Sequence, residues 1–63
     1  MKISEKIKRL RSKKKLTQKE LAKKAGLHLV SVGQIEAKMR TPTLETRKKL
    51  AKALGIPITD LLD

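Results

Sequence analysis

A threonine and a glutamate three positions apart, with a glycine six positions further on, constrain this chain more than any other feature. Thr17 and Glu20 form the pattern of a capping box, in which the threonine hydroxyl caps the amide of Glu20 and the carboxylate returns to the amide of Thr17. Gly26 ends the helix that begins there, because glycine readily adopts the left-handed conformation that closes a helix. We therefore predict one short helix between Thr17 and Gly26, followed by a tight turn.

A second short helix is predicted directly after this turn, from about His28 to Ala37. Val32 and Ile35 fall on its inner side at helical spacing, whereas Val30 lies nearly opposite them. Two short helices joined by a tight glycine turn, over about residues 17–37, form the layout with which small proteins present one helix to the major groove of duplex DNA. An exposed valine at position 30 has no explanation in the packing of the chain itself.

Three further helices are predicted around this pair, and no segment has the pattern of a strand. The first carries apolar residues at helical spacing and ends in a lysine run at 13–15. A fourth follows a loop at 38–42, with Thr43 as its cap and Gly55 at its end. The inner faces of these two helices are formed by Ile3, Ile7 and Leu10, and by Leu44, Leu50, Ala51 and Leu54.

A last short turn completes the predicted all-α fold of five helices. Thr59 is expected to cap it, and it carries Leu61 and Leu62. These two leucines close the bottom of the core, or, if they are exposed, they pair two subunits.

The size and composition of the chain exclude several classes of protein. Sixty-three residues allow one domain, spanning positions 1–63. There is no cysteine, the single histidine His28 cannot hold a metal alone, and the six acidic residues are scattered. We therefore expect no catalysis, no metal or other cofactor and no small-molecule ligand. No apolar run reaches the roughly 20 residues of a membrane span, and the N-terminus lacks an apolar signal core, so we expect a cytoplasmic protein, nucleoid-associated if natural.

The charge of the chain indicates its partner. Seventeen basic residues against six acidic ones give a net charge of +11, which favours polyanions. The chain has no Phe, Tyr or Trp, on which binders of single strands stack bases and with which membrane-surface helices anchor. Duplex DNA, held by its phosphates and read at its base edges, fits best. The alternative is that the lysines serve solubility alone.

Four spaced motifs agree with a known family of DNA-binding domains. They read Leu16-Thr17-Gln18-x-Glu20-Leu21-Ala22-x-x-Ala25-Gly26-Leu27, Val32-x-x-Ile35-Glu36, Pro42-Thr43-Leu44-Glu45-Thr46 and Leu50-Ala51-x-Ala53-Leu54-Gly55-Ile56. From about Ile3 to Leu62 the chain closely resembles the phage repressor and Cro type (XRE family) of helix-turn-helix domain. The resemblance implies a five-helix repressor-like bundle that binds double-stranded DNA and regulates transcription.

The resemblance also implies roles for individual residues. The third helix is the recognition helix, and its base-reading positions correspond to His28, Leu29, Val30, Gly33 and Gln34. The positions that hold the DNA phosphates correspond to Thr17, Gln18, Lys38, Arg40 and Thr41. Arg11 and Glu36 match a pair that forms a partly buried salt bridge between the first helix and the recognition helix.

The chemistry of the side chains supports some of these DNA-binding roles, and for other residues a purely structural role stays possible. Gln34 can pair in bidentate fashion with N6 and N7 of adenine, and Leu29 and Val30 can contact thymine methyl groups. Conversely, Leu29 could belong partly to the core, Gln34 could be solvent-facing filler, and His28 could serve only as a helix cap. Gln18 could be an ordinary helix-start residue. Only Val30 resists a structural explanation.

Some positions depart from the family pattern, and a second function stays open. His28 stands where Ser or Thr is usual, and Lys15 where glycine is common. The framework is close to a consensus while the reading face is unusual, which suggests an engineered binder on a family-like scaffold. The alternative function is an antitoxin-like protein-interaction module with secondary or non-specific DNA binding, whose contacts would be Leu29, Val30, Leu61 and Leu62. We expect a monomer, or a weak dimer on DNA.

Overall fold

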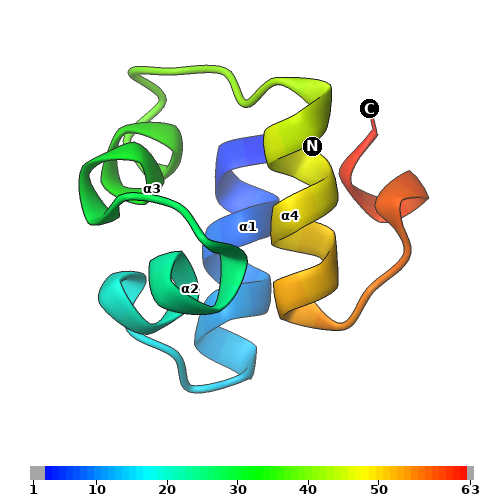
Figure 1. Ribbon diagram of the computed structural model, residues 1–63, viewed down its shortest axis with the longest axis horizontal. Coiled ribbons are helices and arrows are strands. Elements are labelled where there is room, and N and C mark those ends of the chain that lie inside the picture. Colours follow the sequence, from blue (N-terminus) through cyan, green and yellow to red (C-terminus); the bar gives the residue numbers. More distant parts are fainter. Residues whose placement is uncertain (1–2, 63) are drawn as a thin grey trace.

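The structure, a computed structural model, describes residues 3–62, which form four α-helices and a terminal 3-10 helix (Figure 1). The elements are α1 (Ile3–Lys13), α2 (Gln18–Ala25), α3 (Leu29–Glu36), α4 (Leu44–Leu54) and the 3-10 helix η1 (Ile58–Leu61). No strand occurs in the described residues, so the predicted all-α class is confirmed. None of the helices described is both long enough and apolar enough to cross a membrane.

Both predicted ends of α2 are present. The N–H of Glu20 donates to the Thr17 hydroxyl at 3.0 Å, and the N–H of Thr17 donates to Oε1 of Glu20 at 2.8 Å. At the other end Gly26 adopts the left-handed conformation with φ 67°, and the N–H of Leu27 donates to the Ala22 carbonyl at 2.8 Å. Because glycine meets no side-chain clash at this φ, the chain turns sharply from α2 toward α3.

The capping carboxylate makes part of the stability dependent on pH. The backbone N–H of Thr17, which donates to this carboxylate, holds the pKa of Glu20 below its ordinary value of 4.5. Since the folded-state pKa is the lower one, the stabilisation is complete above about pH 4.5 and is lost as the pH falls through the lowered value. The variant Glu20→Gln keeps a capping hydrogen bond without the titrating charge. We expect the Tm values of the two proteins to differ at neutral pH and to converge in acid. A constant difference across the pH range would contradict this account.

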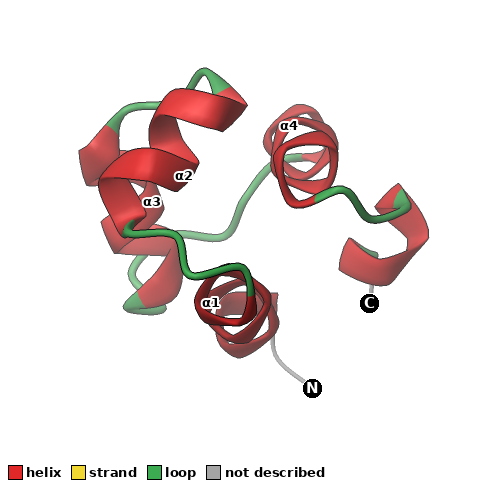
Figure 2. Cartoon of the chain, turned by 90° about the horizontal axis from the view of Figure 1, so that it is seen from below, coloured by secondary structure: helices red, strands yellow, loops and turns green. Residues whose placement is uncertain are grey.

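The core is built from one apolar side of every helix. The side chains that are completely buried are Ile7, Leu21, Val32, Ile35, Leu50, Leu54 and Leu61. The pair α2 and α3 pack against each other, α4 contacts α2, and α1 contacts both α3 and α4. Figure 2 views α1 and α4 close to their axes, with the α2–α3 pair on one side and η1 on the other. This arrangement holds α3 at the edge of the bundle.

The first turn of α4 differs from the prediction. Leu44, predicted on the inner face, is 55% exposed because it lies roughly 70° from the middle of the buried stripe at 100° per residue. Arg47 takes the inner position instead. Its Nε donates to the Pro42 carbonyl at 3.2 Å and its Nη1 donates to the Leu61 carbonyl at 3.1 Å. A search for apolar periodicity cannot find this residue, because its contribution is to satisfy backbone carbonyls.

The C-terminal element is a 3-10 turn rather than a fifth α-helix. It begins after Pro57 and not at the predicted cap Thr59. Leu62 lies just past the end of η1 in an extended conformation, so its side chain does not continue in the direction of its neighbour Leu61. Leu61 is fully buried, whereas Leu62 is 44% exposed. The prediction that both leucines close the core is therefore right for Leu61 and wrong for Leu62.

Candidate nucleic-acid interface

The outer face of α3 exposes two adjacent apolar side chains. Val30 is 67% exposed and Leu29 is 47% exposed, whereas Val32 and Ile35 on the inner face are buried. Leu29 is exposed and is not among the partly buried side chains that pack against the core cluster, which does not favour its alternative interpretation as a partial core residue. The helix thus presents apolar surface both to the core and to the outside.

The remaining residues predicted to read bases adjoin this apolar pair. His28 is the N-cap of α3 by its backbone conformation (φ −76°, ψ 144°), but its exposed side chain makes no capping hydrogen bond. Gly33 and Gln34 are half-buried one turn further along. At 100° per residue the four predicted readers within α3 fall within about 140° of the helix surface. They therefore form one continuous side of the helix.

Gly33 is the position on α3 where a substitution should stabilise the protein. An ideal Cβ built there would lie 3.7 Å from Oε1 of Gln18, which is ordinary van der Waals contact. Glycine inside a helix costs about 0.5–1 kcal/mol relative to alanine, so we expect Gly33→Ala to raise the free energy of unfolding by that amount. Urea denaturation measures the change. The control is Gly26→Ala, which should lower stability because its φ of 67° is left-handed. A loss of stability at Gly33 would show that the methyl group displaces Gln18.

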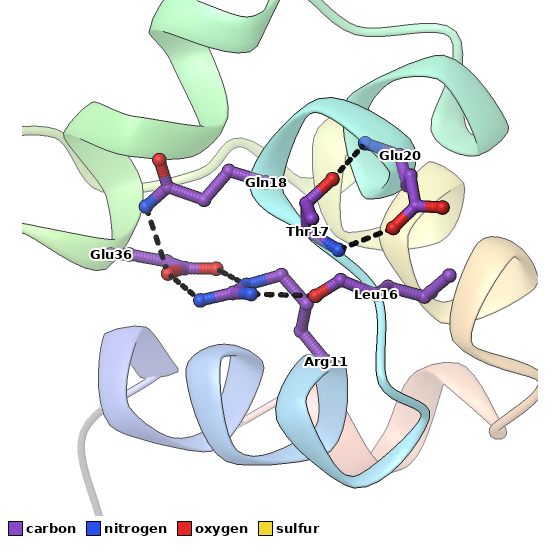
Figure 3. A network of polar contacts seen from close by, with 6 residues as sticks. All are labelled: Arg11, Leu16, Thr17, Gln18, Glu20 and Glu36. Atoms are coloured by element: carbon purple, nitrogen blue, oxygen red, sulfur yellow. Dashed lines mark hydrogen bonds and ion pairs between the residues drawn. The ribbon is translucent and has the colours of Figure 1, made fainter.

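A polar junction ties the C-terminal end of α3 to α1 and α2 (Figure 3). Nε of Arg11 donates to Oε2 of Glu36 at 2.7 Å, and Nη2 donates to Oε1 at 3.0 Å, which is a bidentate ion pair. Nη1 of the same arginine donates to the Leu16 carbonyl at 2.6 Å. Nε2 of Gln18 donates to Oε1 of Glu36 at 3.1 Å. One carboxylate therefore fixes three parts of the chain relative to each other.

Because it is buried, this junction costs more to break by removing one partner than an ordinary surface ion pair does. The side chain of Arg11 is 14% exposed and that of Glu36 only 3%. The hydrogen bond from Arg11 to the Glu36 carboxylate raises the pKa of Arg11 above its usual value, so the guanidinium stays charged. The sequence resemblance pointed to this pair but not to Gln18 as its third member. No spacing in the sequence signals that contact, which depends on how α2 crosses α3.

The residues predicted to hold phosphates lie in two groups. Lys38, Arg40 and Thr41 are exposed and line one hollow of about 280 Å³ between the loop after α3 and the start of α1. Nζ of Lys38 is 3.9 Å from Oε1 of Glu5, a solvent-exposed pair worth little energy. Thr17 lies apart from them at the start of α2, with its oxygen occupied by the cap.

The fold and this surface define a small all-helical protein with a helix-turn-helix, formed by α2, the turn at Gly26 and α3. A helix-turn-helix family model matches residues 7–61. The chain therefore belongs to the helix-turn-helix family, of the XRE type that the phage-repressor resemblance indicated, and it is a DNA-binding protein of the transcription-regulator type.

Similar proteins come from phages and bacteria. The immunity repressor protein of Bacillus phage phi105 is 37% identical over 62 residues, which cover 98% of this chain but only 43% of the repressor. Control protein C.SmaI of Serratia marcescens is 38% identical over 60 residues, covering 95% of this chain and 71% of that protein. The crystal structure of the restriction-modification controller protein C.AhdI from Aeromonas hydrophila has a TM-score of 0.91 at 37% identity, covering 95% of this chain and 91% of that one. The hypothesis of an engineered sequence gains no support from these relatives.

Proposed function

We propose that this protein recognises a specific sequence of duplex DNA by placing the outer face of α3 in the major groove. The observation that carries the proposal is Val30, which is 67% exposed on the side of α3 opposite the core. A partner with apolar groups inside a polyanionic surface explains both this side chain and the net charge of +11. The major groove of DNA offers such groups as the methyls of thymine.

The residues of α3 suit different parts of a base pair. Leu29 and Val30 offer apolar contact to thymine methyls, and the carboxamide of Gln34 can make two hydrogen bonds to adenine. His28 can donate or accept a hydrogen bond, so it fits more than one base. Gly33 adds no side chain, which leaves room for the helix to approach the groove closely.

Phosphate contacts supply most of the affinity in this proposal. Lys38, Arg40 and Thr41 extend from an exposed loop that follows α3 directly. Thr17 accepts a hydrogen bond with its hydroxyl and keeps its own hydrogen for a phosphate oxygen. Gln18 uses one of its two amide hydrogens on Glu36, which leaves the second for a phosphate beside the positive end of α2. Neutralising phosphates releases counterions, so we expect binding to weaken steeply with salt.

A selection from randomised duplexes at one fixed salt concentration tests the proposal. The wild-type protein should enrich a short site, and Gln34→Ala should relax the preference at one adenine position, at a cost of roughly 1–3 kcal/mol. The contrasting variant Lys38→Ala should weaken binding to all sequences alike, and a titration of the selected duplex at several salt concentrations should show a flatter salt dependence. An equal loss on every sequence after Gln34→Ala would remove Gln34 as a reader. No enrichment by the wild type would reduce the function to non-specific coating of nucleic acid.

A second copy of the chain would extend the site that one module reads. Leu44 and Leu62 are about half exposed, and Arg47 binds the carbonyls of their neighbours Pro42 and Leu61. We infer a monomer in solution that pairs weakly through this surface on DNA. Sedimentation of the protein alone and with a two-half-site duplex measures both states.

A protein with this function would be located with the chromosome, in the cytoplasm and on the nucleoid.

The same two leucines favour the second candidate, a protein-interaction module with secondary DNA binding. Tight duplex binding without any protein partner would decide in favour of the DNA reader. Duplex binding that is weak at every sequence, beside tight capture of a partner, would decide for the module.

A further inference from the structure

A second basic surface lies at the end of α2 that is remote from Gln18 and the junction with Glu36. There the last turn of α2 and the second half of α4 enclose a hollow of about 550 Å³. Its lining residues are Lys23, Lys24, Ala25, Gly26, Lys49, Lys52 and Ala53. This hollow shares no residue with the surface proposed to contact DNA.

The hollow itself contains no negative charge to balance the four lysines around it. No acidic residue lines it, and none of the four lysine side chains forms a hydrogen bond or ion pair within residues 3–62. Of the nearby carboxylates, Glu20 accepts the capping hydrogen bond and attracts Lys24 without forming an ion pair with it, and Glu45 lies 3.9 Å from Lys48. Like charges gathered around one concavity repel each other, and an anion bound between them relieves that repulsion.

The shape and composition of the hollow indicate the kind of anion. Its size lies in the range of small-molecule sites, and its floor is small and apolar because it contains Ala25 and Ala53. An ideal Cβ at Gly26 would meet nothing within 4 Å, so the space beside it is open. No arginine lines it to grip one oxyanion in a planar fork, and none of its lining residues has an aromatic ring on which a base could stack. Recognition there depends on the number of negative charges alone.

We propose that this hollow binds a compact polyphosphate anion, either inorganic polyphosphate or the phosphate chain of a nucleotide. The proposal revises the expectation that the protein has no small-molecule ligand. It goes beyond the DNA-binding function and does not depend on it, because binding is measured in the absence of DNA.

Titration with tripolyphosphate, followed by amide NMR of the full chain at about 0.1 M salt, tests this site. We expect saturable shifts of the Gly26 and Ala53 amides. The double variant Lys23→Gln with Lys52→Gln should weaken binding about tenfold, since it removes two of the four charges. The control Lys8→Gln with Lys13→Gln removes the same net charge from exposed positions of α1 and should weaken binding less than about threefold.

Further arms separate the possible ligands. ATP binding no tighter than tripolyphosphate would support recognition of the phosphate chain alone. Continued shifts of the Gly26 and Ala53 amides when a duplex is already bound would support a site separate from the DNA-binding surface. Equal weakening in both double variants, or shifts spread over the lysines of α1, would overturn the proposal in favour of diffuse attraction. Stoichiometric displacement of tripolyphosphate by duplex would overturn it in favour of a DNA contact at this surface.

Discussion

Replacing Glu36 with alanine is expected to lower the free energy of unfolding by about 3–5 kcal/mol. The carboxylate accepts two hydrogen bonds from Arg11 and one from Gln18, and its side chain is 3% exposed. Removing it leaves the Arg11 guanidinium, itself only 14% exposed, without a counter-charge. A domain of this size has a stability of roughly 3–9 kcal/mol, so the variant should be close to unfolding at room temperature. Urea denaturation followed by circular dichroism measures the loss.

The joint replacement of Arg11 by Met and Glu36 by Leu is the matched control. It removes both charges together, so no buried charge is left unpaired, and it should lose less stability than Glu36→Ala alone. If the double variant loses as much free energy of unfolding as Glu36→Ala, then the Glu36 side chain stabilises the junction by packing, and the explanation by an unpaired buried charge is wrong.

Replacing Val30 with aspartate is expected to weaken duplex binding about 100-fold with little effect on folding. The side chain is 67% exposed, so the substitution disturbs no core contact. In the proposed complex it places a carboxylate against the negatively charged groove, and such like-charge contacts cost several kcal/mol. Fluorescence anisotropy with the selected duplex at fixed salt measures the affinity, and thermal unfolding checks the fold.

The variant Thr59→Asp controls for net charge. It makes the same change in charge on η1, which packs against α1 and α4 at the other side of the molecule. We expect it to weaken binding less than about fivefold, through long-range electrostatics alone. Equal losses from the two aspartates would mean that α3 has no special place in the complex.

The ends of the helices could be predicted from the sequence because their chemistry is local. The capping box of Thr17 and Glu20 and the left-handed Gly26 each depend on residues within one turn of each other. The exposure of Val30 followed from helical periodicity in the same way. These features position α3, so the location of the candidate interface could be predicted with them.

The parts that could not be predicted depend on tertiary contacts. Leu44 has an apolar side chain close to the buried side of α4. Arg47 nevertheless takes the inner position, because it binds the carbonyl of Pro42 just before α4 and that of Leu61 in η1. Thr59 has the residue type of a cap, yet the 3-10 turn begins before it. The contact of Gln18 with Glu36 joins residues 18 positions apart, and only the crossing of two helices brings them together.

The most direct test of the proposal is an NMR measurement of intermolecular NOEs in the complex with the selected duplex. We predict cross-peaks between the methyl groups of Val30 and the methyl protons of a thymine, which lie only in the major groove. A complex that forms at the same affinity while the Val30 methyls show no NOE to DNA would contradict the proposal that α3 reads the duplex.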